Sequence, residues 1–163
     1  MKRDKGRHKE PNKESKAQRK AVEARTCTIN MRRLTVGYRS LLEDMLRGEG
    51  LTLPQLRLLK AVREQADVSA AALARTCQVT PQTLQAVLAR AVQAKWIVRG
   101  KSEKNERYVT ATLTPLGESI LETGMAMAAR IEERIWKDVG LSDLKRLNEV
   151  LQAGIANLEA VPA

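Results

Sequence analysis

Apolar residues recur at helical spacing from residue 17 to 47, in steps of four and three. This seam consists of Cys27, Met31, Leu34, Tyr38, Leu41 and Met45. Such a heptad-like repeat is typical of a helix that packs lengthwise against another helix. Gly48 and Gly50 end this first predicted helix. The string TLPQ at 52–55 has the pattern of a capping box, which predicts a second helix running to about residue 65.

Two short helices joined by a turn are predicted next. Ser69 is placed to cap the first of them, whose inward positions are Leu73 and Cys77. Thr80 is placed to cap the second, with Pro81 in its first position. At about 100° per residue, the second helix has one apolar face and one polar or small face. The apolar face holds Leu84, Val87, Leu88, Ala91 and Val92, and the other face holds Gln82, Gln85, Ala86 and Ala89. This arrangement predicts a helix-turn-helix.

A β-hairpin is expected directly after the helix-turn-helix. Residues 97–101 and 108–113 have an extended pattern, and the polar, turn-rich residues 102–107 join them. A helix-turn-helix followed by such a wing fits duplex DNA, because its second helix enters the major groove. The candidate DNA-contacting residues are Thr80, Gln82, Thr83, Gln85, Arg90, Arg99, Lys101, Lys104, Asn105 and Arg107.

Gln82 and Gln85 are the predicted base readers, since a glutamine can hydrogen-bond both edge atoms of adenine. The alternative is that these two glutamines are merely solvated. Arg107 is the candidate for the minor groove, and its alternative is a solvated turn residue.

Two further helices are predicted after the wing. The first, residues 115–137, starts at Thr114 and Pro115, and Gly117 and Gly124 are expected to weaken it slightly. Its apolar positions include Leu116, Ile120, Leu121, Met127, Ile131, Ile135 and Trp136.

Gly140 breaks the chain, and Ser142 is expected to cap the last helix, residues 142–158. A second apolar seam marks this helix, formed by Leu144, Leu147, Leu151, Ile155 and Leu158. A domain of this size cannot bury the apolar stripes of three terminal helices within itself. We therefore expect a two-fold homodimer through these helices, and the alternative is a monomeric bundle.

The net charge of +10 and the pI near 10.0 indicate a polyanionic partner. Residues 1–20 hold nine Lys or Arg against three Asp or Glu. Residues 1–16 lack an apolar run that would offset the entropy of ordering, so we expect a disordered basic tail. This tail either holds DNA phosphates or keeps the protein soluble. Residues 17–163 then form one domain, mainly α with a small β-wing, whose DNA-binding lobe is 52–113.

Several other functions are disfavoured. Neither a signal peptide nor a membrane-spanning run is present, which indicates a soluble, cytoplasmic protein. Cys27 and Cys77 lack metal-ligand spacing, and the one histidine, His8, lies in the tail, so we expect no metal, no cofactor and no enzyme. Two Trp, two Tyr and no Phe argue against single-stranded nucleic acid, whose bases stack on aromatic side chains.

The order of elements and four local strings resemble the MarR family of bacterial winged-helix transcription regulators, over residues 31–158. The strings are LTLPQLRLL at 51–59, LARTCQVTPQTLQAVLAR at 73–90, WIVR at 96–99 and ATLTPLGESIL at 111–121. The resemblance implies a dimeric DNA-binding protein, usually a repressor, that a small ligand or an oxidant releases. It also implies a ligand pocket near Tyr38, Arg39, Leu56 and Trp96.

The chain departs from the family pattern at several positions. Glu106 and Arg107 stand where an Asp-Arg pair is usual in the wing. Lys95 stands where a glycine usually ends the recognition helix, and a left-handed residue other than glycine costs about 1 kcal/mol there. Ala86 and Ala89 replace charged residues, whereas Arg90 matches the family.

The two cysteines have different expected roles. Cys77, four residues after Leu73, is expected in the core. Some MarR-family members sense hydroperoxides through a first-helix cysteine, which makes Cys27 a redox candidate, although its place in the seam favours packing. Three functions therefore remain open: a sequence-specific repressor, a non-specific DNA-coating protein and a dimerisation module without DNA binding.

Overall fold

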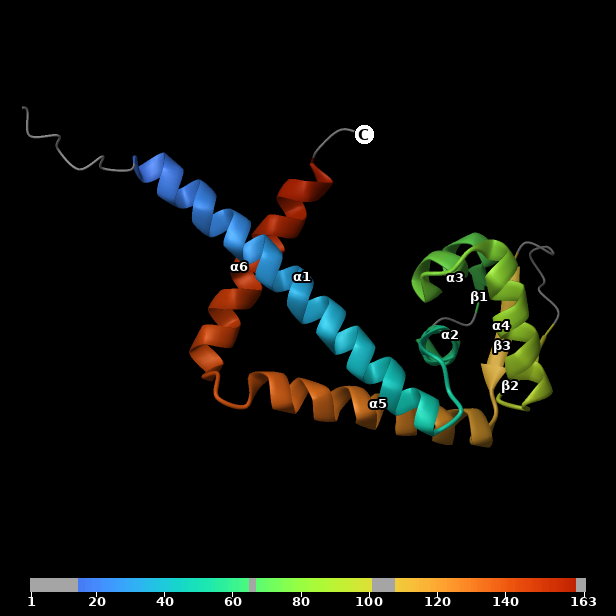
Figure 1. Cartoon of the computed structure of the whole chain (residues 1–163). Coiled ribbons are helices and arrows are strands. Elements are labelled where there is room, and N and C mark those ends of the chain that lie inside the picture. The colour runs from blue at the N-terminus through green and yellow to red at the C-terminus, as the bar shows by residue number, and fades with distance from the viewer. Residues whose placement is uncertain (1–14, 65–66, 101–107, 161–163) are drawn as a thin grey trace, which may run out of the picture. The chain divides into compact units, whose positions relative to one another are not determined.

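The computed structural model describes residues 15–64, 67–100 and 108–160. The chain divides into two units, one up to Ser40 and one from Leu41 onwards. The elements are α1 (Lys16–Gly48), α2 (Leu53–Glu64), β1 (Asp67–Ser69), α3 (Ala70–Cys77), α4 (Pro81–Gln93), β2 (Ile97–Arg99), β3 (Tyr108–Leu113), α5 (Pro115–Trp136) and α6 (Leu141–Glu159) (Figure 1). The predicted class, mainly α with a small β-wing, is confirmed.

The long first helix is confirmed, and it ends where the two glycines predicted. Gly50 has a φ of 68°, and its N–H donates to the Arg47 carbonyl at 3.1 Å while that of Leu51 donates to Leu46 at 3.0 Å. These two bonds form a Schellman ending, which favours glycine at the left-handed position. The predicted seam of α1 is exposed or half-buried, and Leu42 and Leu46 are the residues of this helix that are buried.

The helix-turn-helix follows from local capping. The Thr52–Gln55 capping box forms, because the Gln55 side-chain oxygen accepts from the Thr52 N–H at 2.8 Å and the Thr52 hydroxyl from the Gln55 N–H at 3.4 Å. Ser69 caps α3 and Thr80 caps α4, both as predicted. The predicted inward positions are buried, except that Val92 is 39% exposed at the edge of the apolar face. The fully buried leucines of this lobe are Leu58, Leu59, Leu73, Leu84 and Leu88.

The wing sheet has three strands in the order β1-β3-β2, all antiparallel. The predicted hairpin contained β2 and β3 and therefore lacked the third strand, β1. β1 immediately precedes α3 and pairs Val68 with Val109. A strand of three residues carries too short an alternation to be recognised alone, and its pairing with a segment about forty residues later defines it.

The C-terminal end of α4 retains the left-handed conformation that a glycine would favour. Lys95 has a φ of 59°, and its N–H donates to the Val92 carbonyl while the Trp96 N–H donates to Ala91, both at 2.9 Å. The helix therefore ends in a second Schellman arrangement with a lysine in the strained position. Lys95 therefore occupies the left-handed position at which a glycine is usual.

Close packing explains the two glycines of α5, which we expected only to weaken the helix. A Cβ added to Gly117 would lie 2.0 Å from the carbonyl oxygen of Trp96, and one added to Gly124 would lie 2.4 Å from a methyl carbon of Leu56. Both glycines are buried. They let α5 approach the end of α4 and the side of α2, so their effect is to permit this packing.

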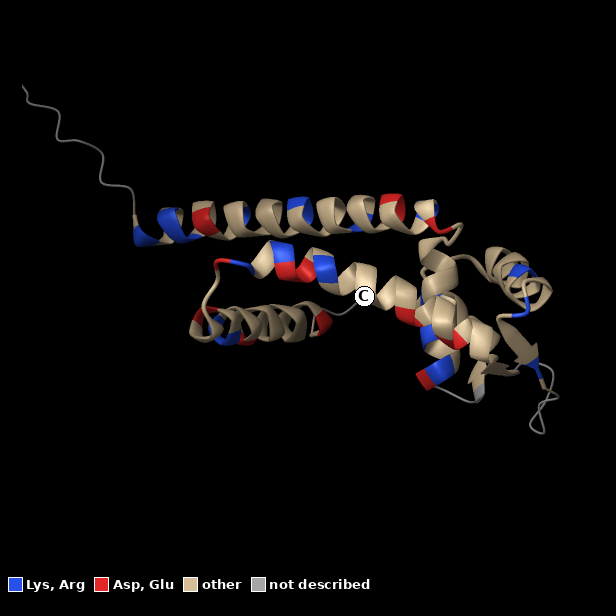
Figure 2. Ribbon diagram, turned by 90° about the horizontal axis from the view of Figure 1, so that it is seen from below, with Lys and Arg blue, Asp and Glu red and all other residues tan. Residues whose placement is uncertain are grey.

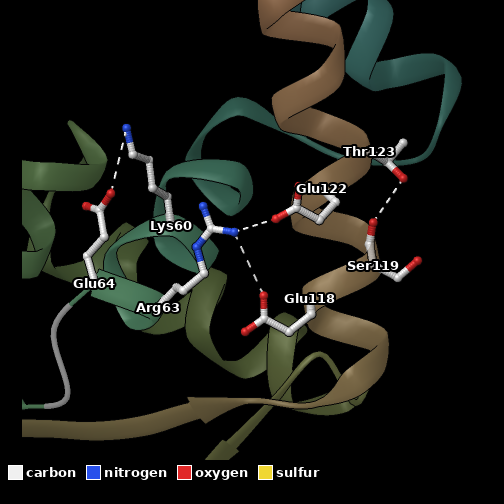
Figure 3. A network of polar contacts seen from close by, with 7 residues as sticks. All are labelled: Lys60, Arg63, Glu64, Glu118, Ser119, Glu122 and Thr123. Carbon is white, nitrogen blue, oxygen red and sulfur yellow. Dashed lines mark hydrogen bonds and ion pairs between the residues drawn. The ribbon is translucent and has the colours of Figure 1, made fainter.

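Ion pairs also join α2 to α5 (Figure 3). The Arg63 guanidinium lies 2.5 Å from a carboxylate oxygen of Glu122 and 3.9 Å from one of Glu118. Figure 3 shows that both acids project from α5 towards Arg63 on α2. These contacts and the glycine packing fix α5 against the helix-turn-helix.

The last helix begins one residue earlier than predicted. Gly140 is its N-cap and makes no side-chain capping bond, so the expectation that Ser142 caps α6 was wrong. Ser142 is already the second helical residue, whereas a capping side chain must precede the first. No residue of α6 is buried. In the described part of the chain, no helix is long and apolar enough to cross a membrane.

Candidate nucleic-acid interface

The outward face of α4 is the best-formed candidate surface in the described residues. The four residues predicted to face outward from this helix are all exposed, namely Gln82, Gln85, Ala86 and Ala89. The candidate DNA-contacting residues Thr83 and Arg90 are exposed as well. The opposite face is anchored by Leu84 and Leu88, whose side chains are 0% and 1% exposed. The helix is therefore held rigidly from behind while it presents polar and small side chains to a partner.

Gln93 also belongs to this face, although it was not among the predicted residues. Gln93 is exposed, and at about 100° per residue it lies within about 20° of Gln82 around the helix. Gln82, Ala86, Ala89 and Gln93 therefore form one stripe at steps of four, three and four. The helical period carried this signal, because Gln93 follows Ala86 and Ala89 at steps of seven and four residues.

The chemistry of the stripe suits base edges. The glutamine amides can donate to and accept from adenine, and an alanine methyl can contact the thymine methyl group. Because Ala86 and Ala89 are small, they also allow the helix backbone to approach closely. Arg90 at the side of the stripe is suited to a phosphate or to guanine.

The start of α4 is tightly capped. The Thr80 hydroxyl oxygen accepts from the Thr83 N–H at 3.1 Å, and the two hydroxyl oxygens lie 2.9 Å apart. This geometry assigns Thr80 mainly to the helix cap, although it was predicted to contact DNA. The exposed Thr83 hydroxyl stays at the surface beside it.

Arg57 of α2 supports the turn between α3 and α4. Its guanidinium donates to the carbonyl of Cys77, the last residue of α3, at 3.4 Å. Burial raises the pKa of the Cys77 thiol to about 11, although the positive charge of Arg57 acts in the opposite direction. Cys77 is fully buried, as predicted, and its thiol remains protonated at neutral pH. Its role in this geometry is packing.

The wing residues are only partly within the described structure. Arg99 is exposed on β2, which pairs with β3 through Arg99 and Ala111. Lys101, Lys104, Asn105, Glu106 and Arg107 lie outside the described residues. Their predicted DNA contacts therefore stay predictions.

The residues of the predicted ligand pocket have different surroundings. Leu56 is buried, and Trp96 is half-buried. Tyr38 and Arg39 belong to the other unit. Two surface hollows of about 200 and 550 Å³ occur elsewhere, one at the α1–α2 junction and one beside Lys95 and Arg99. Neither hollow is lined by the four predicted residues, so that pocket stays a prediction.

Other candidate chemistry is sparse. Cys27, the redox candidate, is exposed on α1 and is not in a disulfide. Within residues 15–64, 67–100 and 108–160, no three His, Cys, Asp or Glu side chains group closely enough to hold a metal ion. The outward face of α4 therefore remains the main candidate site.

The capped helix pair, the three-stranded wing and the flanking helices define a winged helix-turn-helix protein. The family model for the MarR family matches residues 49–107. Residues 49–107 are thus similar to the MarR family, which confirms the resemblance seen in the sequence.

Two named relatives illustrate the similarity. The HTH-type transcriptional repressor Rv2887 of Mycobacterium tuberculosis is 33% identical over 86 residues, and the alignment covers 53% of this chain and 62% of the relative. The HTH-type transcriptional repressor Mb2911 of Mycobacterium bovis matches to the same extent. The match therefore spans less than two thirds of the length of these relatives.

Solved structures extend the likeness to most of the fold. The crystal structure of Rv2887 with salicylic acid has a TM-score of 0.62 and 26% identity, and the match covers 76% of this chain and 91% of that protein. A MarR-family regulator from Silicibacter pomeroyi has a TM-score of 0.70 over 84% of this chain and 92% of its own length, at 17% identity. The second comparison shows a shared fold alone.

Proposed function

We propose that this protein is a sequence-specific regulator of transcription that binds double-stranded DNA and acts as a repressor. The outward face of α4 carries the proposal: a capped, rigidly packed helix presents three glutamines and two alanines to a partner. The M. tuberculosis and M. bovis relatives are named transcriptional repressors, which supports the same function. Acting on chromosomal DNA, the protein would work in the cytoplasm.

Gln82 and Gln85 are the proposed base readers, with Gln93 added from the structure. Thr83, Arg90 and Arg99 are proposed to hold phosphates or neighbouring bases. From the sequence alone we propose that Lys101, Lys104, Asn105 and Arg107 contact the flanking DNA.

A homodimer through the terminal helices is part of the proposal. Large apolar side chains stay exposed along α6 in the single chain, among them Leu141, Leu147, Val150, Ile155 and Leu158. Exposed apolar surface of this extent favours a protein partner. Light scattering should give twice the monomer mass, and a monomer at micromolar concentration would contradict the dimer.

We further propose release by a small aromatic acid. Rv2887 has been crystallised with salicylic acid and with p-aminosalicylic acid. The family resemblance would place such a ligand near Tyr38, Arg39, Leu56 and Trp96. Titrating salicylate into the protein–operator complex tests this point, because release at millimolar concentrations supports an effector and unchanged binding opposes it. Oxidant release through Cys27 is the alternative, and a Cys27→Ser variant that still responds to peroxide would eliminate it.

Selection of bound fragments from the source genome tests the main function. A regulator should recover a small set of related sites, with a large affinity ratio over random duplex at physiological salt. Gln82→Ala and Gln85→Ala should each cost about 1–3 kcal/mol against the preferred base at one operator position.

Gln152→Ala is the matched control, because Gln152 is an exposed glutamine on α6. A uniform loss across all sequences would contradict base reading. It would favour the second candidate, a non-specific DNA-coating protein, which the concentration of basic residues near the N-terminus supports.

A further inference from the structure

Almost all the net charge of the chain lies in its first forty residues. Residues 1–40 contain thirteen Lys or Arg and four Asp or Glu, a net +9, whereas residues 41–163 contain sixteen and fifteen, a net +1. The winged lobe is therefore nearly neutral as a whole. The excess of basic residues, which indicates a polyanionic partner, therefore lies in the first unit. The α4 interface belongs to the other unit.

The described part of this unit is the helix α1 from Lys16 to Ser40. It carries seven basic residues and one acidic residue, Glu23, and all of these are exposed. Figure 2 shows the basic residues recurring along much of the helix.

Three arginines recur at seven-residue steps: Arg25, Arg32 and Arg39. At about 100° per residue they fall within about 40° around the helix, and at about 1.5 Å per residue they span about 21 Å along it. We call these three residues the arginine line. The neutral Thr28 and Thr35 lie beside it, and Glu23 lies on the other side of the helix.

The arginine line and the predicted dimer seam occupy different faces of α1. The seam, represented by Cys27, Leu34 and Met45, lies about 140° around the helix from the middle of the line. A partner helix on the seam would therefore leave the arginines facing outward. The proposed homodimer therefore does not account for this second face.

We propose that the arginine line is a second, sequence-independent binding surface for duplex DNA, separate from the winged lobe. Duplex DNA presents about one negative charge per 1.7 Å of its axis, so a line about 21 Å long passes many phosphates. Arginine suits this role because its planar guanidinium can bind a phosphate through two parallel hydrogen bonds. This surface goes beyond the sequence reading that we propose for α4.

An anionic membrane is the rival partner, because Val22, Ile29 and Val36 form an exposed apolar line next to the arginines. Helices that lie in a membrane interface generally present Trp, Phe and Leu on a broad apolar face. The line here has three β-branched residues and no aromatic residue. The chemistry of α1 therefore favours phosphates on DNA.

The test compares two double variants of the full chain. Arg25→Gln/Arg32→Gln removes two charges from the line, and Arg19→Gln/Lys20→Gln removes two charges from the same helix about 120–140° away from Arg25. Glutamine retains high helix propensity, so both variants should keep the helix. Arg39 is left unchanged because it also interacts within the chain. Circular dichroism and light scattering check helix content and mass.

Binding to a short duplex of random sequence is measured by fluorescence anisotropy between about 50 and 200 mM salt. We expect Arg25→Gln/Arg32→Gln to weaken binding at least about tenfold at the low salt concentration. The slope of log affinity against log salt should fall by about 1.8 for each protomer, at about 0.9 per phosphate contact. Arg19→Gln/Lys20→Gln should have a much smaller effect.

Equal losses in the two variants would show diffuse attraction only and would overturn the proposal, as would no loss in either. Loss of binding to phosphatidylglycerol vesicles without loss of duplex binding would assign the surface to membranes instead. Sequence preference is measured on the same samples. A wild-type protein without any preference would refute the repressor function, while the comparison of the two variants would still decide this inference.

Discussion

Replacing Gly117 by alanine should destabilise the protein, although alanine is the better helix former. The added Cβ would lie 2.0 Å from the Trp96 carbonyl oxygen and 2.9 Å from its carbon. Both atoms belong to the backbone, so no side-chain rotation relieves the overlap. The same oxygen accepts the Thr114 N–H at 3.0 Å. The Thr114 hydroxyl donates mainly to the neighbouring Lys95 carbonyl at 2.7 Å and accepts from the Gly117 N–H at 3.0 Å. Moving α5 away would therefore stretch the bonds that begin the helix.

The magnitude follows from three terms. Alanine gains about 1 kcal/mol over glycine in helix propensity. Overpacking against a fixed backbone costs about 1–3 kcal/mol. Weakening the bond from the Thr114 N–H to the Trp96 carbonyl and the bond from the Thr114 hydroxyl to the Lys95 carbonyl costs about 1 kcal/mol each. The net loss of unfolding free energy is therefore about 2–4 kcal/mol. At about 2–4 °C per kcal/mol for a chain of this size, Tm should fall by roughly 5–15 °C.

Thermal and urea unfolding followed by circular dichroism measure the effect. Gly37→Ala is the matched control, because a Cβ built there meets no heavy atom within 4 Å outside its own stretch of helix. It should leave stability unchanged or raise it by up to about 1 kcal/mol. A Gly117→Ala protein as stable as Gly37→Ala would refute the close approach of α5 to the end of α4.

Three further predictions concern the lobe and its attachment to α5. Lys95→Gly should raise the unfolding free energy by about 1 kcal/mol, because glycine adopts the φ of 59° without steric strain. An unchanged or lower Tm would contradict the Schellman ending of α4. The stability contribution of Cys77 should decline as pH rises from about 9 to about 11, because the unfolded chain loses the thiol proton first. The measurement is the difference in unfolding free energy between wild type and Cys77→Ala. A difference that stays constant over this pH range would oppose the raised pKa. Arg63→Met should lower the unfolding free energy by at most about 1 kcal/mol, because the side chains of Glu118 and Glu122 are about half-exposed or more. This loss should shrink in high salt. A loss of several kcal/mol at every salt concentration would show that packing, and not charge, joins α2 to α5.

Features set by neighbouring residues could be predicted from the sequence. Thr80, Pro81 and the apolar steps from Leu84 to Ala91 define α4 because capping and helical periodicity act over one or two turns. The same holds for the Thr52–Gln55 capping box. The outward residues of α4 followed directly, since a helix with one buried face must expose the other.

Features set by contacts between distant segments required the tertiary structure. β1 exists because Val68 meets Val109, and Gly117 is needed because the Trp96 carbonyl lies against it. Lys95 keeps a left-handed conformation because Trp96 must continue directly into β2, whatever residue stands before it. Periodicity shows which face of a segment is apolar, but it does not show how closely the segment that covers that face packs against it. Close approaches and strained turns therefore appeared only when the elements were packed together.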